Sequence, residues 1–169
     1  WLRFTLIIRS NINYYNLVKT KLLCSMNSQA AIAHLQQDST LQPLLANIEM
    51  PDFTPSGRIY YDLLESIVSQ QLSVKVADVI FKRFLSLFPD NYPHPNHVVA
   101  IEFDRLRSVG LSGQKAGYLQ NVAKFAIEND LEKMDWAAMT DDEIITFLTT
   151  IKGVGKWTVQ MLLMFTLAR

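Results

Sequence analysis

The stretch Phe147-Leu-Thr-Thr-Ile-Lys-Gly-Val-Gly-Lys-Trp-Thr158 contains the end of one predicted helix, a tight turn and the start of a second helix. Gly153 and Gly155 lack a Cβ, so the backbone can turn sharply there and approach another molecule closely. Amides at the start of a helix attract anions, and Lys152 and Lys156 add positive charge on both sides. The motif predicts a helical hairpin able to hold a phosphate, although an ordinary hairpin with glycines in its turn has the same spacing.

The segment after this turn is apolar around nearly the whole helix, from Val159 to Leu167. This pattern predicts that the helix lies in the core. Trp157 stands at its start, and two interpretations of this residue remain open. It is either an ordinary core residue or a surface on which an extruded base stacks.

Upstream of the hairpin, apolar residues recur at helical spacing from Ser28 onward, and strict alternation never continues beyond a few residues. The predicted fold class is therefore all-α, a helical bundle. We expect Ser73 to cap one helix, Pro89 to stop it, and Gly110 to end the helix that follows. The expected helices cover residues 28–37, 41–48, 60–71, 74–87, 96–109, 112–128 and 141–150.

Composition and charge exclude several classes of protein. Hydrophobic residues make up 49% of the 169 residues, which excludes a mainly disordered chain. Lys plus Arg and Asp plus Glu are 16 each, so any basic surface must be local. The single cysteine, Cys24, excludes an internal disulfide, a thiolate metal site and an iron–sulfur cluster, and it favours a reducing, intracellular environment. No apolar run reaches the roughly 20 residues of a membrane-spanning helix.

The N-terminal segment differs in character from the rest. Residues 1–37 carry four basic residues and no acid. Met26 precedes the first helical pattern, so we interpret residues 1–25 as non-native or translated upstream sequence, with a targeting peptide as the alternative. Residues 26–169 then form one helical domain.

The segment from Glu128 to Glu143 has seven acids and one lysine, which predicts a solvated face. Within it, Thr140 and Glu143 have the spacing of a capping box, in which each side chain satisfies the other residue's amide. The histidines, His34, His94 and His97, lack the partners of a transition-metal site and are expected at the surface.

Three segments occur in an order and spacing that is more specific than the hairpin alone. They are residues 67–75 (IVSQQLSVK), 109–116 (VGLSGQKA) and 151–158 (IKGVGKWT). In these segments the chain, over about residues 40–169, resembles the helix-hairpin-helix Gly/Pro-Asp base-excision DNA glycosylases, and within them the DNA-3-methyladenine glycosylase II (alkylpurine) type. The resemblance implies a two-lobed helical fold that binds double-stranded DNA across a cleft and flips an alkylated base into a pocket.

The resemblance also assigns residues to roles. Trp157, Gln70, Gln71 and Ser73 match positions that line the base pocket or enter the DNA, with a polar cap at a helix junction as the alternative for the last three. Positions that bind the DNA backbone fall on Lys152, Gly153, Val154, Gly155, Lys156, Thr158, Gly113, Gln114 and Lys115. Gly113 is also the nearest match to the wedge that fills the gap left by a flipped base in some relatives.

Two further features follow from the resemblance. The hairpin of the family holds a monovalent cation, Na⁺ or K⁺, through main-chain carbonyls that correspond to Thr149, Ile151 and Val154. In relatives with lyase activity a lysine nucleophile occupies the position of Trp157, so this chain resembles the monofunctional members. An indole there also suits a cationic alkylated purine, since electron-rich aromatic faces attract cations.

The catalytic aspartate of the family follows the hairpin helix, and the resemblance puts its position beyond Arg169. We therefore expect these 169 residues to be an inactive fragment of a monomeric, intracellular enzyme that acts on DNA and binds no membrane. Asp141, Asp142 and Glu143 are better interpreted as cap and dipole partners than as replacements. The alternative function is a non-catalytic helix-hairpin-helix DNA-binding module, which would need neither a pocket nor a lining aromatic residue.

Overall fold

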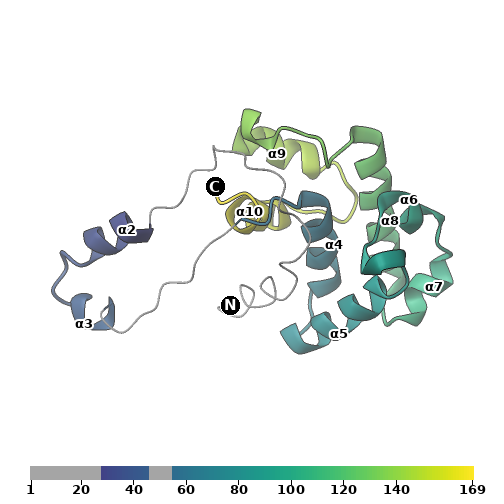
Figure 1. The fold of residues 1–169 in the computed structure, drawn as a ribbon, viewed down its shortest axis with the longest axis horizontal. Coiled ribbons are helices and arrows are strands. Elements are labelled where there is room, and N and C mark those ends of the chain that lie inside the picture. Colours follow the sequence, from purple (N-terminus) through teal and green to yellow (C-terminus); the bar gives the residue numbers. More distant parts are fainter. Residues whose placement is uncertain (1–27, 46–54) are drawn as a thin grey trace.

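The computed structural model describes residues 28–45 and 55–169, and every regular element in these ranges is helical (Figure 1). The predicted all-α class is thus confirmed for the described residues. The interpretation of residues 1–25 concerns residues outside these ranges. The helices are α2 (Ser28–Leu35), α3 (Gln42–Leu45), α4 (Ile59–Ser69), α5 (Val74–Leu85), α6 (Pro95–Ala100), α7 (Phe103–Ser108), α8 (Gly113–Asn129), α9 (Asp141–Leu148) and α10 (Lys156–Phe165), with short 3₁₀ turns at Pro89–Asn91 and Trp136–Ala138.

Helices α4 and α8 form the centre of the core. Helix α8 packs against α4, α6 and α7, while α4 also contacts α5 and α10. The apolar residues of α4 recur at helical spacing, and Leu63, Leu64, Ile67 and Val68 are fully buried. Burying a side chain of this size stabilises the fold by about 1.5–3 kcal/mol, so this one helix contributes much of the core energy.

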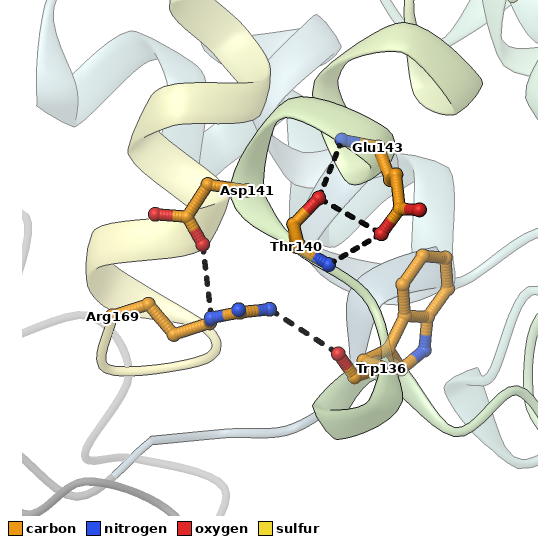
Figure 2. Close-up of polar contacts among 5 residues, drawn as sticks. All are labelled: Trp136, Thr140, Asp141, Glu143 and Arg169. Atoms are coloured by element: carbon orange, nitrogen blue, oxygen red, sulfur yellow. Dashed lines mark hydrogen bonds and ion pairs between the residues drawn. The ribbon is translucent and has the colours of Figure 1, made fainter.

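Side-chain capping bonds mark the starts of two helices, α8 and α9. Thr140 and Glu143 form the predicted capping box, with Thr140 N donating to Glu143 Oε2 at 2.7 Å and Glu143 N donating to Thr140 Oγ1 at 3.3 Å (Figure 2). Ser112 Oγ accepts from the amide of Lys115 at 3.2 Å and begins α8. Ser73 occupies the N-cap position of α5, as predicted, but makes no capping bond with its side chain.

The predicted helix over residues 96–109 is wrong in one respect, because the structure divides it into α6 and α7. Ile101 and Glu102 between them are extended, with ψ of 139° and 138°. Gln120 of α8 donates to the Ile101 carbonyl at 3.1 Å, so a helix distant in sequence satisfies the backbone at the break. The preceding helix ends at Leu85, and Pro89 begins a 3₁₀ turn instead of stopping the helix.

Helix α10 is only partly in the core, contrary to the expectation from its composition. Val159, Leu162 and Leu163 are buried, but 57% of Trp157 and 42% of Met164 are exposed. The helix therefore packs one face against α4 and α9 and leaves the other accessible.

The end of the chain is tied to the bundle by polar contacts. Thr166 Oγ1 donates to Asp62 Oδ2 at 2.7 Å, and the amide of Gly57 donates to the Thr166 carbonyl at 3.0 Å. Arg169 pairs with Asp141 at 3.0 Å and donates to the Trp136 carbonyl at 3.2 Å (Figure 2). Across residues 28–45 and 55–169, the helices are too short or too polar to cross a membrane.

Candidate nucleic-acid interface

The turn between α9 and α10 has the geometry that its two glycines suggested. The amide of Ile151 donates to the Leu148 carbonyl at 3.2 Å, and the amide of Val154 donates to the Ile151 carbonyl at 3.0 Å. Gly153 has φ +108°, a value that residues with a side chain rarely adopt. Gly155 is extended, with φ −97°, and occupies the N-cap position of α10. A left-handed residue is thus needed at the first glycine only.

The hairpin buries its apolar residues and exposes its charges. Ile151 and Val154 are buried, while Lys152 and Lys156 are exposed on either side of the turn. Thr158 is also buried, which does not favour a phosphate contact from its side chain. The exposed surface of the turn therefore combines two ammonium groups with the amides at the start of α10.

Side chains of α8 contact the backbone of the hairpin. A Cβ built on Gly153 would lie 2.2 Å from Tyr118 Cγ, which shows that the tyrosine ring packs directly on the glycine backbone. Gln114 donates to the Tyr118 hydroxyl at 2.6 Å, and Asn121 Nδ2 donates to the Lys152 carbonyl at 3.2 Å. The hairpin is thus held by side chains of a long helix rather than by its own turn alone.

The turn between α4 and α5 contains three of the four predicted pocket residues, and the fourth, Trp157, lies in the first turn of α10. Gln70 is half-buried at the C-cap of α4, and Gln71 is exposed with φ +58°. Ser73 is exposed at the start of α5. Lys115 Nζ donates to the carbonyls of Val68 and Gln70, at 2.7 Å each, and so joins this turn to α8.

The other residues predicted at the DNA backbone lie at the start of α8. Gln114 is exposed, and Gly113 is half-buried next to the ring of Phe103, which a Cβ would contact at 3.7 Å. Gly113, Gln114 and Lys115 thus form the first turn of α8, and the structure brings this turn close to the α4–α5 turn through Lys115.

A groove between α4, α5 and α10, with a cavity volume of about 80 Å³, was not predicted from the sequence. Its walls include Leu72, Met161 and Phe165, together with the carboxyl groups of Asp62 and Glu65. Burial raises the pKa of Asp62, although hydrogen bonds from Ser56 and Thr166 oppose this. Burial also raises the pKa of Glu65, from 4.5 to about 7, with Asp62 adding to the effect.

The groove lies next to the predicted pocket residues along the chain. The groove is lined by Ser69 at the end of α4, Leu72 in the turn and Val74 at the start of α5. These residues flank Gln70, Gln71 and Ser73 in the sequence. Met161 of α10 also lines the groove. It follows Trp157 by four residues, so these two side chains share a face of α10. The sequence signal for the groove was the pair of acids, Asp62 and Glu65, three residues apart in a helix with a buried apolar face.

Comparison with known proteins places this arrangement in a family. Residues 64–167 match the family model described as HhH-GPD superfamily base excision DNA repair protein, and the chain belongs to this superfamily. Among its relatives, DNA-3-methyladenine glycosylase 1 of Schizosaccharomyces pombe is 37% identical over 112 residues, which are 65% of this chain and 49% of the relative. The DNA-3-methyladenine glycosylase of Saccharomyces cerevisiae is 28% identical over 152 residues, 80% of this chain and 51% of the relative.

Solved structures agree with this assignment. The S. pombe 3-methyladenine DNA glycosylase Mag1 in complex with abasic DNA has a TM-score of 0.72 and 32% identity, over 83% of this chain and 71% of Mag1. A DNA-3-methyladenine glycosidase from Bacillus halodurans has a TM-score of 0.64 and 30% identity, over 86% and 67% of the two chains. The chain spans about half the length of the curated relatives it matches.

Proposed function

We propose that this chain acts in a DNA-3-methyladenine glycosylase, a monofunctional enzyme of base excision repair. The reaction is hydrolysis of the N-glycosidic bond of an alkylated purine in double-stranded DNA after base flipping. The hairpin supports DNA binding, and the observation that carries the enzyme proposal is the groove between α4, α5 and α10, whose Met161 shares a face of α10 with the exposed Trp157. Mag1, which was solved with abasic DNA, supports it.

The hairpin would bind DNA through its phosphates. Lys152 and Lys156 neutralise phosphate charge, and the amides at the start of α10 donate hydrogen bonds to phosphate oxygens. Such contacts position the protein on the duplex without reading its sequence. This suits an enzyme that must find a damaged base in any sequence context.

The main-chain carbonyls of Thr149, Ile151 and Val154 would hold a Na⁺ or K⁺ ion in this turn. The donors fit such an ion, because they are neutral oxygens within one six-residue turn. The Ile151 carbonyl already accepts from the Val154 amide at 3.0 Å and would use its second lone pair for the ion. The ion would add positive charge next to the phosphate-binding amides.

Trp157 and the groove would receive the flipped base. The exposed indole offers a face for a purine that carries a positive charge, and the carboxyl groups of the groove favour the same charge when they are ionised. An indole cannot act as an amine nucleophile, so a covalent imine with the sugar does not form at this position. This is the reason for proposing a monofunctional enzyme.

The test is binding of the 169-residue chain to two duplexes that differ only in one abasic site. A glycosylase binds the abasic duplex more tightly, and Trp157→Ala is expected to reduce this preference while binding to the undamaged duplex changes little. Equal affinity of the wild-type chain for both duplexes would instead indicate a non-catalytic DNA-binding module. Excision is tested separately, by release of 3-methyladenine from methylated DNA.

We also propose that the protein is a monomer and acts wherever the cell keeps its DNA. Sedimentation of the chain with and without a short duplex tests the first point, since a monomer forms a one-to-one complex. Imaging of the protein in living cells tests the second.

A further inference from the structure

Lys115 makes contacts that differ from those of a lysine exposed for DNA binding. Its ammonium donates to the carbonyls of Val68 and Gln70, both at 2.7 Å, although these residues are 47 and 45 positions away. The last carbonyls of a helix have no intrahelical donor and carry the negative end of the helix dipole. Lys115 therefore satisfies the end of α4 from a neighbouring helix.

The segment after these carbonyls has a conformation that needs support. Gln70 has φ −51° and ψ 128°, and Gln71 then has φ +58°, in the left-handed region. The left-handed conformation costs a residue with a Cβ roughly 1–2 kcal/mol of free energy, so other contacts must stabilise this conformation of the turn. The bond from Lys115 to the Gln70 carbonyl lies directly before the left-handed residue.

The electrostatic surroundings of Lys115 agree with this role. Two of its three N–H donors are used by carbonyls, and no carboxylate in the described ranges forms an ion pair with it. Partial burial lowers its pKa, because removal from water disfavours the charged form. The ammonium is thus directed into the protein toward the end of α4.

The same side of α8 supports the hairpin. Lys115, Tyr118 and Asn121 follow one another at intervals of three residues. Tyr118 packs on Gly153, and Asn121 donates to the Lys152 carbonyl at 3.2 Å. One rigid helix therefore sets the positions of the α4–α5 turn and of the hairpin relative to each other.

We propose that Lys115 is a positioning residue, which fixes the turn of Gln70 and Gln71 relative to the hairpin so that both meet the same stretch of damaged DNA. The inference rests on the proposed function, and it replaces the sequence-based assignment of Lys115 to a phosphate contact. The two roles differ in how they affect salt dependence and the preference for a lesion.

The first experiment compares Lys115→Met and Lys115→Arg with Lys156→Met, a matched loss of charge at the hairpin. Each variant is titrated with the abasic and the undamaged duplex at several salt concentrations. We expect Lys115→Met to reduce the preference for the abasic duplex about tenfold, which is the size of effect that the loss of a hydrogen bond from a charged group has. The salt dependence of binding should not change. Lys115→Arg should restore most of the preference, because a guanidinium also donates to two carbonyls.

Lys156→Met should behave in the opposite way. Loss of one phosphate contact lowers the salt slope by about 0.9 and weakens binding to both duplexes alike. The same behaviour in Lys115→Met, with the abasic preference kept, would overturn the inference and make Lys115 a phosphate contact.

The second experiment needs no DNA. Amide hydrogen exchange at residues 69–73 should become at least about tenfold faster in Lys115→Met, while α8 and the hairpin keep wild-type protection. Unchanged exchange at residues 69–73 would refute the positioning role. Failure of the wild-type chain to prefer the abasic duplex would refute the proposed function instead, so the two failures are distinguishable.

Discussion

At the scale of single residues, the two glycines of the hairpin have different roles. An alanine at position 153 would place its Cβ in the ring of Tyr118, and the residue would have to adopt φ +108°. A Cβ at Gly155 meets nothing within 4 Å. We expect Gly153→Ala to lower the free energy of unfolding by about 2–4 kcal/mol, since strain and overlap add. Gly155→Ala is the matched control and should cost less than about 1 kcal/mol. Urea denaturation measures both, and equal losses would contradict the packing of Tyr118 on Gly153.

Glu65 should make the stability of the protein depend on pH. Its pKa is raised from 4.5 to about 7, mainly by burial, with Asp62 and Asp78 adding to the shift and Arg58 opposing it. The folded state then binds more protons than the unfolded state between these values, so the contribution of Glu65 to stability is fully present below about pH 4.5 and is lost as the pH rises to about 7. Asp62, whose pKa is also raised, acts in the same direction.

Glu65→Gln should therefore flatten the pH dependence in this window. Above pH 7 we expect the variant to be more stable than wild type by about 2 kcal/mol, because the cost of ionising a half-buried carboxyl is removed. The control is Glu128→Gln, which changes an exposed glutamate of α8. Thermal unfolding across pH 4–8 tests this, and parallel curves for wild type and Glu65→Gln would contradict it.

At the scale of elements, the start of α9 is determined by its own sequence. The reciprocal bonds of Thr140 and Glu143 satisfy two amides that have no partner within the helix. Thr140→Ala should cost about 1 kcal/mol of stability. Thr146→Ala, an exposed threonine in the middle of the same helix, should change stability by less than about 0.5 kcal/mol. A larger loss at Thr146 than at Thr140, measured by chemical denaturation, would count against the cap.

The boundaries of other elements depend on contacts with residues that are distant in the sequence. α6 and α7 are separate helices because the extended residues between them are held by Gln120 of α8. Nothing near Ile101 in the sequence shows this break. The α4–α5 turn likewise depends on Lys115, which follows it by more than 40 residues.

At the scale of the whole molecule, a chain with zero net charge presents a local basic site at the hairpin. Lys156→Glu should weaken binding to abasic and undamaged duplexes to the same extent, about tenfold or more at low salt, and should reduce the salt slope. Lys133→Glu reverses a charge in the acid-rich segment and should leave both affinities nearly unchanged. Fluorescence anisotropy at several salt concentrations checks both variants. A selective loss for the abasic duplex in Lys156→Glu would contradict a phosphate contact.

Those parts of the fold that depend on neighbours within a few residues were predictable from the sequence. Helical spacing predicted the all-α class, the Thr140 capping box was confirmed, and the glycines located the hairpin turn. The motifs of the three segments also led to the correct superfamily. The roles of Trp157, Gln70, Gln71 and Ser73 in a base pocket stay predictions.

The amino-acid sequence by itself thus determined the helical class, the capping box of α9 and the hairpin, because the interactions responsible span one or two helical turns. Only the tertiary structure decided which groups meet across the fold. Asp62 accepts from Thr166, 104 residues away, and the groove beside them forms only when α4, α5 and α10 pack together. The ammonium of Lys115 likewise finds its carbonyl partners only after α8 has packed on α4, since burial and hydrogen bonding at such distances depend on packing that local spacing does not encode.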